Sequence, residues 1–240
     1  MLTRVYIDNY RCFVNFMFQP QAKQLILGLN GTGKTEFLKV LGVLRNFVGG
    51  DQKVNQLFIP EALTRWQSLS RQAFELEITG KDGVYRYTLG VDVQEKRAKT
   101  RVVKEALEFN GEPLVLFEGE QVSLFDDDHA ETTSYPFQPD RSVLSTLRSG
   151  AKLRWFKEWL EKLCCIRINP ALMATEEDLG GDWLEDDLSN FAAWYSNFTL
   201  EHPRENAELF RALQEVLDGF VSLNFPRISS RRRLLQANFE

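Results

Sequence analysis

Residues 25–48 read LILGLNGTGKTEFLKVLGVLRNFV, and this stretch decides the expected fold. Its first three residues, Leu25 to Leu27, are apolar and predict a short buried strand. After the glycine-rich turn GLNGTGKT at 28–35, apolar residues recur at helical spacing at Leu38, Leu41, Leu44 and Val48. They predict a largely buried helix that ends at the pair of glycines beyond Val48. The expected order is therefore strand, glycine-rich turn and helix.

The turn matches the phosphate-binding pattern G-x-x-x-x-G-K-[ST] through Gly28, Gly33, Lys34 and Thr35. Glycines allow consecutive backbone N–H groups to point at phosphate oxygens, and the start of the helix adds partial positive charge. We predict that Lys34 is the catalytic residue and reaches the β- and γ-phosphates, and that the Thr35 hydroxyl binds Mg²⁺. The alternative is a strand-to-helix turn with a solvated lysine, and the flanking strand and helix favour the phosphate site.

The base of the expected nucleotide follows from what the sequence lacks. A guanine-recognition loop of the Asn-Lys-x-Asp type is absent. The one Asp-x-x-Gly match, Asp178 to Gly181, lies in an acidic segment with no strand before it. We therefore predict ATP, with Mg²⁺, rather than GTP.

Composition and charge describe an ordinary globular chain. Its 240 residues are 43% hydrophobic and 26% charged, enough to bury a core, and 29 Lys and Arg against 34 Asp and Glu give a net charge of −5. This balance gives no general attraction to nucleic acid. Basic runs at Lys96 to Lys104 and Arg231 to Arg233 leave a local contact with DNA open, and solvated charge is the favoured interpretation.

The cysteine content and the hydropathy of the chain indicate the cellular compartment of the protein. The chain has 3 cysteines, without the spacing of a zinc site or of a disulfide framework, which favours a reducing compartment. No apolar run approaches the length of a membrane span. We expect a cytoplasmic protein with no membrane partner.

The rest of the chain predicts hairpins followed by helices. Strand pairs are expected around TGKDG at 79–83 and across Asn110-Gly111. Residues 126–140, DDDHAETTSYPFQPD, are polar and predict an exposed loop. Helical spacing of apolar residues predicts three helices, over 152–165, 183–200 and 206–220.

These elements predict an α/β protein in three parts. A β-rich nucleotide-binding lobe spans 1–125, the exposed loop spans 126–140, and a helical subdomain spans 141–240.

The stretch IDNYRCFVNFMF at 7–18, followed by the glycine-rich turn, resembles the start of RecF/SMC-like ATPases of the ABC class, including the OLD-like and "AAA family" ATP-binding proteins. Residues 102–111 and 187–220 are similar to later parts of those proteins, so the resemblance spans most of the chain. It implies a P-loop NTPase head of ABC/RecF-like type, with a mixed sheet that includes antiparallel hairpins, a helical subdomain and an incomplete overall architecture.

The resemblance also implies site residues. Arg11 corresponds to the family's early arginine, which lies near the nucleotide phosphates, and a guanidinium suits that role. The alternative for Arg11 is a surface arginine beside a turn, and the residues leave both open. The implied nucleotide-binding set is Arg11, Gly28, Asn30, Gly31, Thr32, Gly33, Lys34, Thr35 and Glu36.

Other parts of the family's hydrolytic site are missing from the sequence. Such proteins hydrolyse ATP when an LSGGQ-like signature of one head meets the P-loop of another, and no LSxGx string occurs here. The two candidates for a Walker B strand, Leu114 to Glu118 and Val122 to Asp127, fit hairpin strands better. We therefore expect hydrolysis to require a C-terminal ATPase lobe or a second copy in a head-to-head dimer, with the isolated chain inactive or very weak.

Two other functions remain open. The chain could be a non-hydrolytic ATP-sensing regulatory or scaffold module, or, with less support, a small-molecule kinase. By analogy with the resembling family, the expected setting is DNA maintenance or defence against phage, in which ATP controls an effector protein.

Overall fold

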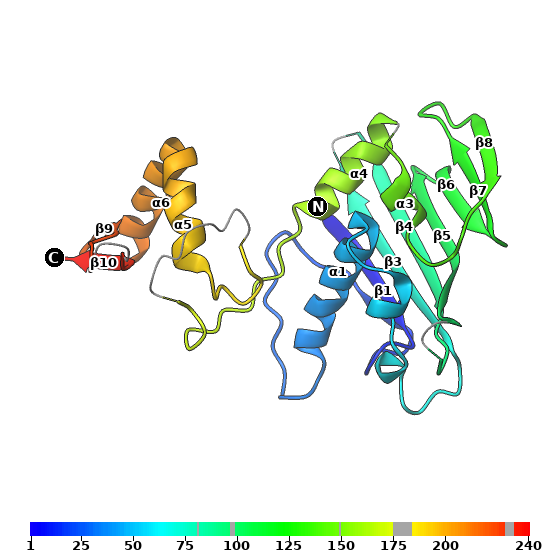
Figure 1. Ribbon diagram of the computed structural model, residues 1–240, viewed down its shortest axis with the longest axis horizontal. Helices are drawn as coiled ribbons and strands as arrows, with labels where there is room; N and C mark the ends of the chain where they lie inside the picture. Colours follow the sequence, from blue (N-terminus) through cyan, green and yellow to red (C-terminus); the bar gives the residue numbers. More distant parts are fainter. Residues whose placement is uncertain (81, 97–98, 149, 175–183, 229–232) are drawn as a thin grey trace. The chain divides into compact units, whose positions relative to one another are not determined.

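The computed structural model describes residues 1–80, 82–96, 99–148, 150–174, 184–228 and 233–240 (Figure 1). The chain divides into two compact units, Met1–Leu163 and Cys164–Glu240. It is an α/β protein, which is the predicted class, and one large antiparallel sheet dominates it. The first unit extends past the predicted lobe boundary at 125, because the helical segment before Leu163 packs on the sheet.

The sheet of the first unit has eight strands in the order β2-β1-β3-β4-β5-β6-β7-β8. Every neighbouring pair is antiparallel, so the parallel pairs of a mixed sheet do not occur among the described residues. The predicted hairpins are the pairs β3/β4 and β5/β6. The strands are β1 (Leu2–Asp8), β2 (Phe16–Phe18), β3 (Arg71–Thr79), β4 (Val84–Asp92), β5 (Arg101–Phe109), β6 (Glu112–Glu118), β7 (Gln121–Phe125) and β8 (Glu131–Pro136).

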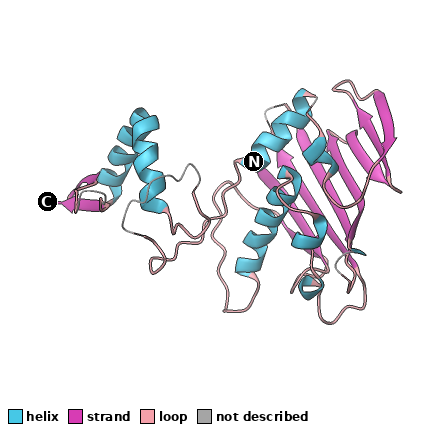
Figure 2. Cartoon of the chain, in the orientation of Figure 1, coloured by secondary structure: helices cyan, strands magenta, loops and turns pink. Residues whose placement is uncertain are grey.

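Helices lie on one face of this sheet (Figure 2). They are α1 (Lys34–Gly49), α2 (Val54–Leu57), the 3-10 turn η1 (Pro60–Ala62), α3 (Val143–Thr146) and α4 (Ala151–Glu161). Alternation along the strands supplies the core under them, since Phe74, Leu76 and Ile78 of β3 are fully buried. The buried residues of α1 are Phe37, Val40, Leu41, Leu44, Phe47 and Val48. Leu38, predicted on the buried face, is 45% exposed.

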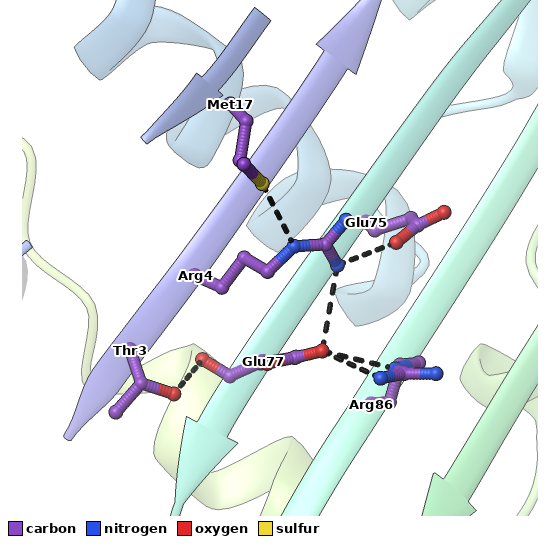
Figure 3. Close-up of polar contacts among 6 residues, drawn as sticks. All are labelled: Thr3, Arg4, Met17, Glu75, Glu77 and Arg86. Carbon is purple, nitrogen blue, oxygen red and sulfur yellow. Dashed lines mark hydrogen bonds and ion pairs between the residues drawn. The ribbon is translucent and has the colours of Figure 1, made fainter. Parts of the chain in front are cut away.

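The opposite face of the sheet is polar and carries a ladder of charges across β1, β3 and β4 (Figure 3). Arg4 Nη1 lies 2.6 Å from Glu75 Oε2 and 3.4 Å from Glu77 Oε1. Arg86 Nη2 lies 2.7 Å from the same Glu77 oxygen. These side chains keep partial contact with solvent, so each pair contributes at most about 1 kcal/mol. The ladder keeps this face polar rather than stabilising the fold.

The predicted exposed loop at 126–140 is wrong for Glu131–Pro136, which form the edge strand β8. A tight turn starts it, because Asp126 Oδ1 accepts hydrogen bonds from the backbone N–H groups of Asp128 and Ala130. The backbone of β7 then offers free ladder positions to a segment rich in threonine. The proline is tolerated because it ends an edge strand. Most of the segment is solvent-exposed, as predicted.

The second unit contains α5 (Phe191–Glu201), α6 (Pro203–Val216) and an antiparallel pair, β9 (Phe220–Asn224) with β10 (Gln236–Phe239). It is not purely helical, contrary to the prediction for 141–240. The predicted helix over 183–200 begins later, because Leu188 has a positive φ and Asp187 Oδ1 accepts the N–H of Ser189 in a local turn. Residue 183 lies outside the described residues.

The third predicted helix ends before Phe220. Gly219 adopts φ 76°, a left-handed conformation, and the chain turns there into β9. Among the described residues, helices are too short or too polar for one to traverse a lipid bilayer.

We expect Phe74→Ala to destabilise the first unit by about 3–5 kcal/mol, since its buried ring packs on Tyr10 and Phe58. Glu75→Ala, on the adjacent residue of the polar face, should cost no more than about 1 kcal/mol. Urea unfolding followed by circular dichroism measures both. Equal losses would show that the polar ladder contributes more than its exposure allows.

Candidate phosphate-binding site

The glycine-rich turn leads directly into α1, which begins at Lys34. Gly31 and Gly33 have φ values of 83° and 93°, in the left-handed region that glycine adopts without strain. The turn is closed by hydrogen bonds from Thr32 to the Leu29 carbonyl, 3.4 Å from its backbone N–H and 2.9 Å from its hydroxyl. Backbone conformation thus brings the chain abruptly into the helix.

Gly33 lies against the turn that follows β1. A Cβ at this position would lie 2.6 Å from Cys12 Sγ and 3.3 Å from Phe13 Cζ, so a side chain here would force these neighbours to shift. By contrast, a Cβ at Gly31 would meet nothing within 4 Å. Neither Cys12 nor Phe13 was predicted to matter, because the pattern of the glycine-rich turn gives no information about its tertiary neighbours.

The Lys34 side chain folds back over the turn. Its Nζ donates hydrogen bonds to the carbonyl oxygens of Gly28 and Leu29, at 2.7 and 2.6 Å, and lies 3.4 Å from Thr32 Oγ1. The ammonium group is therefore held beside the N-terminus of α1, a 16-residue helix whose first backbone N–H groups have no intrahelical acceptor. Both features attract anions.

The other predicted binding residues occupy the same end of α1. Asn30 and Thr35 are exposed, so their polar groups are accessible to a ligand. Glu36 is half-buried, and its carboxylate pairs with Lys39 Nζ at 2.7 Å. Among the described residues, no group of three or more His, Cys, Asp or Glu side chains is placed to hold a metal ion. A cation here would need oxygen ligands from a bound phosphate beside the Thr35 hydroxyl.

Arg11 lies beside the first turn of α1. Its Nε is 3.8 Å from Glu36 Oε2, and its Nη1 donates a hydrogen bond to the Glu61 carbonyl at 2.8 Å. Its own backbone N–H donates to the Ala62 carbonyl at 2.7 Å, which holds the residue at φ 54°. The structure thus places Arg11 beside the first turn of the helix, and its neighbour Cys12 lies against Gly33 of the glycine-rich turn.

The prediction of a buried strand at Leu25 to Leu27 is wrong. Residues 19–33, all of which are described, form no strand between β2 and α1, and Leu25, Leu27 and Leu29 are 75%, 80% and 81% exposed. A strand needs a neighbouring backbone for its hydrogen bonds, and no described strand pairs with this segment. The apolar pattern alone does not supply that partner.

A cavity of about 360 Å³ adjoins the turn. Gly28, Thr32, Gly33 and Lys34 contribute to one wall, and the remaining lining is apolar: Phe13, Phe16, Phe18, Ile26, Leu27 and Phe37. The rings of Phe18 and Phe37 meet edge to face, with centroids 5.1 Å apart. An anion-attracting turn and an apolar hollow therefore lie side by side.

The two Walker B candidates form hairpin strands, as their sequence favoured. They are β6 and β7, which pair with each other several strands away from β1 and β2. Of the basic runs, Arg101 pairs with Asp92 at 3.8 Å, while Arg97 and residues 231–232 lie outside the described residues.

No protein-family model matches the chain, and no curated protein matches it. The resemblance to RecF/SMC-like ATPases therefore depends on the residues quoted above, and the site is argued from its own geometry.

Gly33→Ala should destabilise the first unit by about 2–5 kcal/mol, because a left-handed φ and a clash with Cys12 act together. Gly31→Ala is the matched control: it carries the left-handed φ without the clash and should cost about 1–2 kcal/mol. Thermal and urea unfolding distinguish them. Similar losses in the two variants would mean that Gly33 does not pack against Cys12 in solution.

Proposed function

We propose that this chain is the ATP-binding head portion of a RecF/SMC-like ATPase of the ABC class, with a P-loop NTPase fold. Residues 28–35 would hold the phosphates of Mg-ATP. The observation that carries the proposal is the Lys34 ammonium group, folded over a glycine-rich turn at the N-terminus of α1. This arrangement places a cation beside the positive end of a helix.

Phosphate binding would exchange one set of acceptors for another. The carbonyl oxygens of Gly28 and Leu29 now accept hydrogen bonds from Lys34, and anionic β- and γ-phosphate oxygens are stronger acceptors for an ammonium group. The exposed Thr35 hydroxyl suits Mg²⁺, which takes oxygen ligands and shares them with phosphates and water. Gly31, Thr32 and Gly33 would contribute backbone donors.

Arg11 would add a second positive charge to the phosphates. It lies near the first turn of α1, where Glu36 Oε2 is 3.8 Å from its Nε. This distance is a weak ion pair in a half-exposed setting, so the guanidinium can change partner at little cost. In this proposal Glu36 positions Arg11 until the nucleotide binds.

Hydrolysis would need groups from a further ATPase lobe or from a second copy. Phosphoryl transfer requires a positioned water and stabilisation of the developing charge, and the described hydrogen bonds of the Lys34 ammonium group all go to atoms of its own turn. The exposed Leu25, Leu27 and Leu29, beside an apolar cavity, support such a partner, since burying them would stabilise its association.

The second candidate is a non-hydrolytic ATP-sensing regulatory or scaffold module. It is favoured because the hydrogen bonds of Lys34 stay within its own turn. Such a site could bind phosphate without any group that takes part in hydrolysis. In either function we place the protein in the cytoplasm, with an effector protein as partner, in DNA maintenance or phage defence. Contact with DNA stays an open hypothesis that the net charge of −5 does not favour.

Titration calorimetry with Mg-ATP tests the site. Lys34→Ala should weaken binding by about tenfold or more, because it removes a charge-assisted hydrogen bond to phosphate. Lys162→Ala removes the same charge from an exposed position after α4 and should bind like the natural chain. Unchanged affinity in Lys34→Ala, or no binding by the natural chain, would contradict the proposal. Mg-GTP, run in parallel, tests the preference for adenine.

Thr35→Ala should raise the Mg²⁺ concentration needed for ATP binding several-fold, while Thr35→Ser, which keeps the hydroxyl, should not. Titrating Mg²⁺ at fixed ATP measures this dependence. If the two variants behave alike, the Thr35 hydroxyl is not a ligand of the metal.

Phosphate release and sedimentation separate the two functions. Binding without release fits a head that awaits its partner or an ATP sensor, and steady release that Lys34→Ala abolishes would show that this chain is sufficient for hydrolysis. Dimer formation with Mg-ATP, lost in Leu27→Asp, would assign the partner as a second copy.

A further inference from the structure

Glu105 is a fully buried carboxylate at the centre of the first unit. It lies on β5, and three donors from two other elements surround it. The Tyr87 hydroxyl on β4 donates to Oε1 at 2.9 Å, and the Ser142 hydroxyl donates to the same oxygen at 2.6 Å. The backbone N–H of Val143 donates to Oε2 at 2.7 Å. The carboxylate thus joins the sheet to the first residues of α3.

Helix α3 depends on such anchors because it is a single turn of four residues. Glu105 holds its N-terminal end. At its C-terminal end, Lys157 Nζ of α4 donates to the carbonyl oxygens of Leu144 and Leu147, at 2.9 and 3.0 Å. Two side chains from other elements therefore hold the ends of α3, in addition to the burial of its own Val143 and Leu144.

The position of α3 affects the glycine-rich turn through α1, which contacts α3. A Cβ at Gly50, which caps the C-terminus of α1, would lie 2.9 Å from Ser145 Cβ. The helix that begins with Lys34 thus abuts α3 at its far end. A shift of α3 removes the surface against which α1 ends.

No cation in the described contacts of Glu105 balances its charge. From α4, Lys157 faces the other end of α3. In the segment before α3, Asp140 pairs with Lys53 at 2.8 Å and with Arg141 at 3.3 Å. From β4, the Tyr87 phenol contacts Glu105, and burial keeps it protonated by raising its pKa well above the usual value.

Burial consequently dominates the acidity of Glu105. It raises the pKa of the carboxyl group from 4.5 to about 7, although the hydrogen bonds from Ser142, Val143 and Tyr87 act in the lowering direction. A neutral carboxyl group fits the same site, because either hydroxyl can turn and accept its proton while Oε2 still accepts the Val143 N–H. The site accommodates both protonation states, but the free energy of burying the carboxyl group differs between them.

We propose that Glu105 is a proton-responsive clasp on α3. The protonated side chain seats α3 firmly on the sheet, and loss of the proton favours opening, because water then solvates an anion that the closed core leaves without a counter-charge. The sign follows from linkage: a raised folded-state pKa gives stability that is present at low pH and is lost as the pH rises through about 7. The clasp is independent of whether the glycine-rich turn binds ATP.

Hydrogen exchange of the full chain between pH 5 and pH 8 tests the clasp. After correction for intrinsic exchange rates, protection of the amides around Val143 should fall on the order of 10- to 100-fold across this range. Glu105→Gln keeps the shape, cannot ionise, and should remove the dependence. Glu108→Gln, on the same strand at a half-buried position, should keep the profile of the natural chain.

A second variant keeps the proposal falsifiable if Glu105→Gln fails to fold. Ser142→Ala removes one donor to the ionised carboxylate, so the pH at which half of the pH-dependent protection is lost should move upward. Protection that does not change with pH in the natural chain would overturn the clasp. So would a dependence that persists in Glu105→Gln, or one that is unmoved in Ser142→Ala.

Discussion

Helix α1 is flanked at both ends by glycines that pack closely against other parts of the first unit, and the candidate site depends on this constraint. Gly33 lies against Cys12 at the N-terminus, and Gly50 lies against Ser145 at the C-terminus. Between them, Leu44 and Phe47 are fully buried. The helix cannot slide along its axis without a clash or a void, both of which cost stability in a close-packed core. Lys34 and the glycine-rich turn are therefore held at a defined place.

Charged groups are distributed in the first unit according to their access to water. The ladder of Arg4, Glu75 and Glu77 on the open face is paired and partly solvated, so it stabilises little. Lys34 lies where a helix N-terminus offers donors to an anion. Glu105 is the exception, since it is an ionisable group in the core with hydroxyl and amide partners only among its described contacts. Such a group costs stability when charged, which is why its protonation carries a structural consequence.

Local pattern predicted the elements whose determinants are local. The hairpins β3/β4 and β5/β6 follow from alternating residues and turn residues, and the start of α1 follows from the glycine-rich turn. The incorrect predictions concern segments whose structure depends on pairing with another strand. Leu25 to Leu27 have strand character and no partner, whereas Glu131–Pro136 have polar character and become a strand because β7 is beside them. A strand needs a neighbouring backbone for its hydrogen bonds, and the apolar or polar character of a segment does not show whether it has one.

The sequence by itself determined that the chain is α/β, that a glycine-rich turn opens a buried helix, and which residues make up that turn. These properties depend on backbone conformation and on apolar periodicity, which neighbouring residues specify. Only the tertiary structure decided that Gly33 packs on Cys12, that Arg11 reaches Glu36, and that Glu105 joins β5 to α3. Each of these contacts joins residues far apart along the chain, or fixes the direction of one side chain, so it exists only after the helices have packed on the sheet.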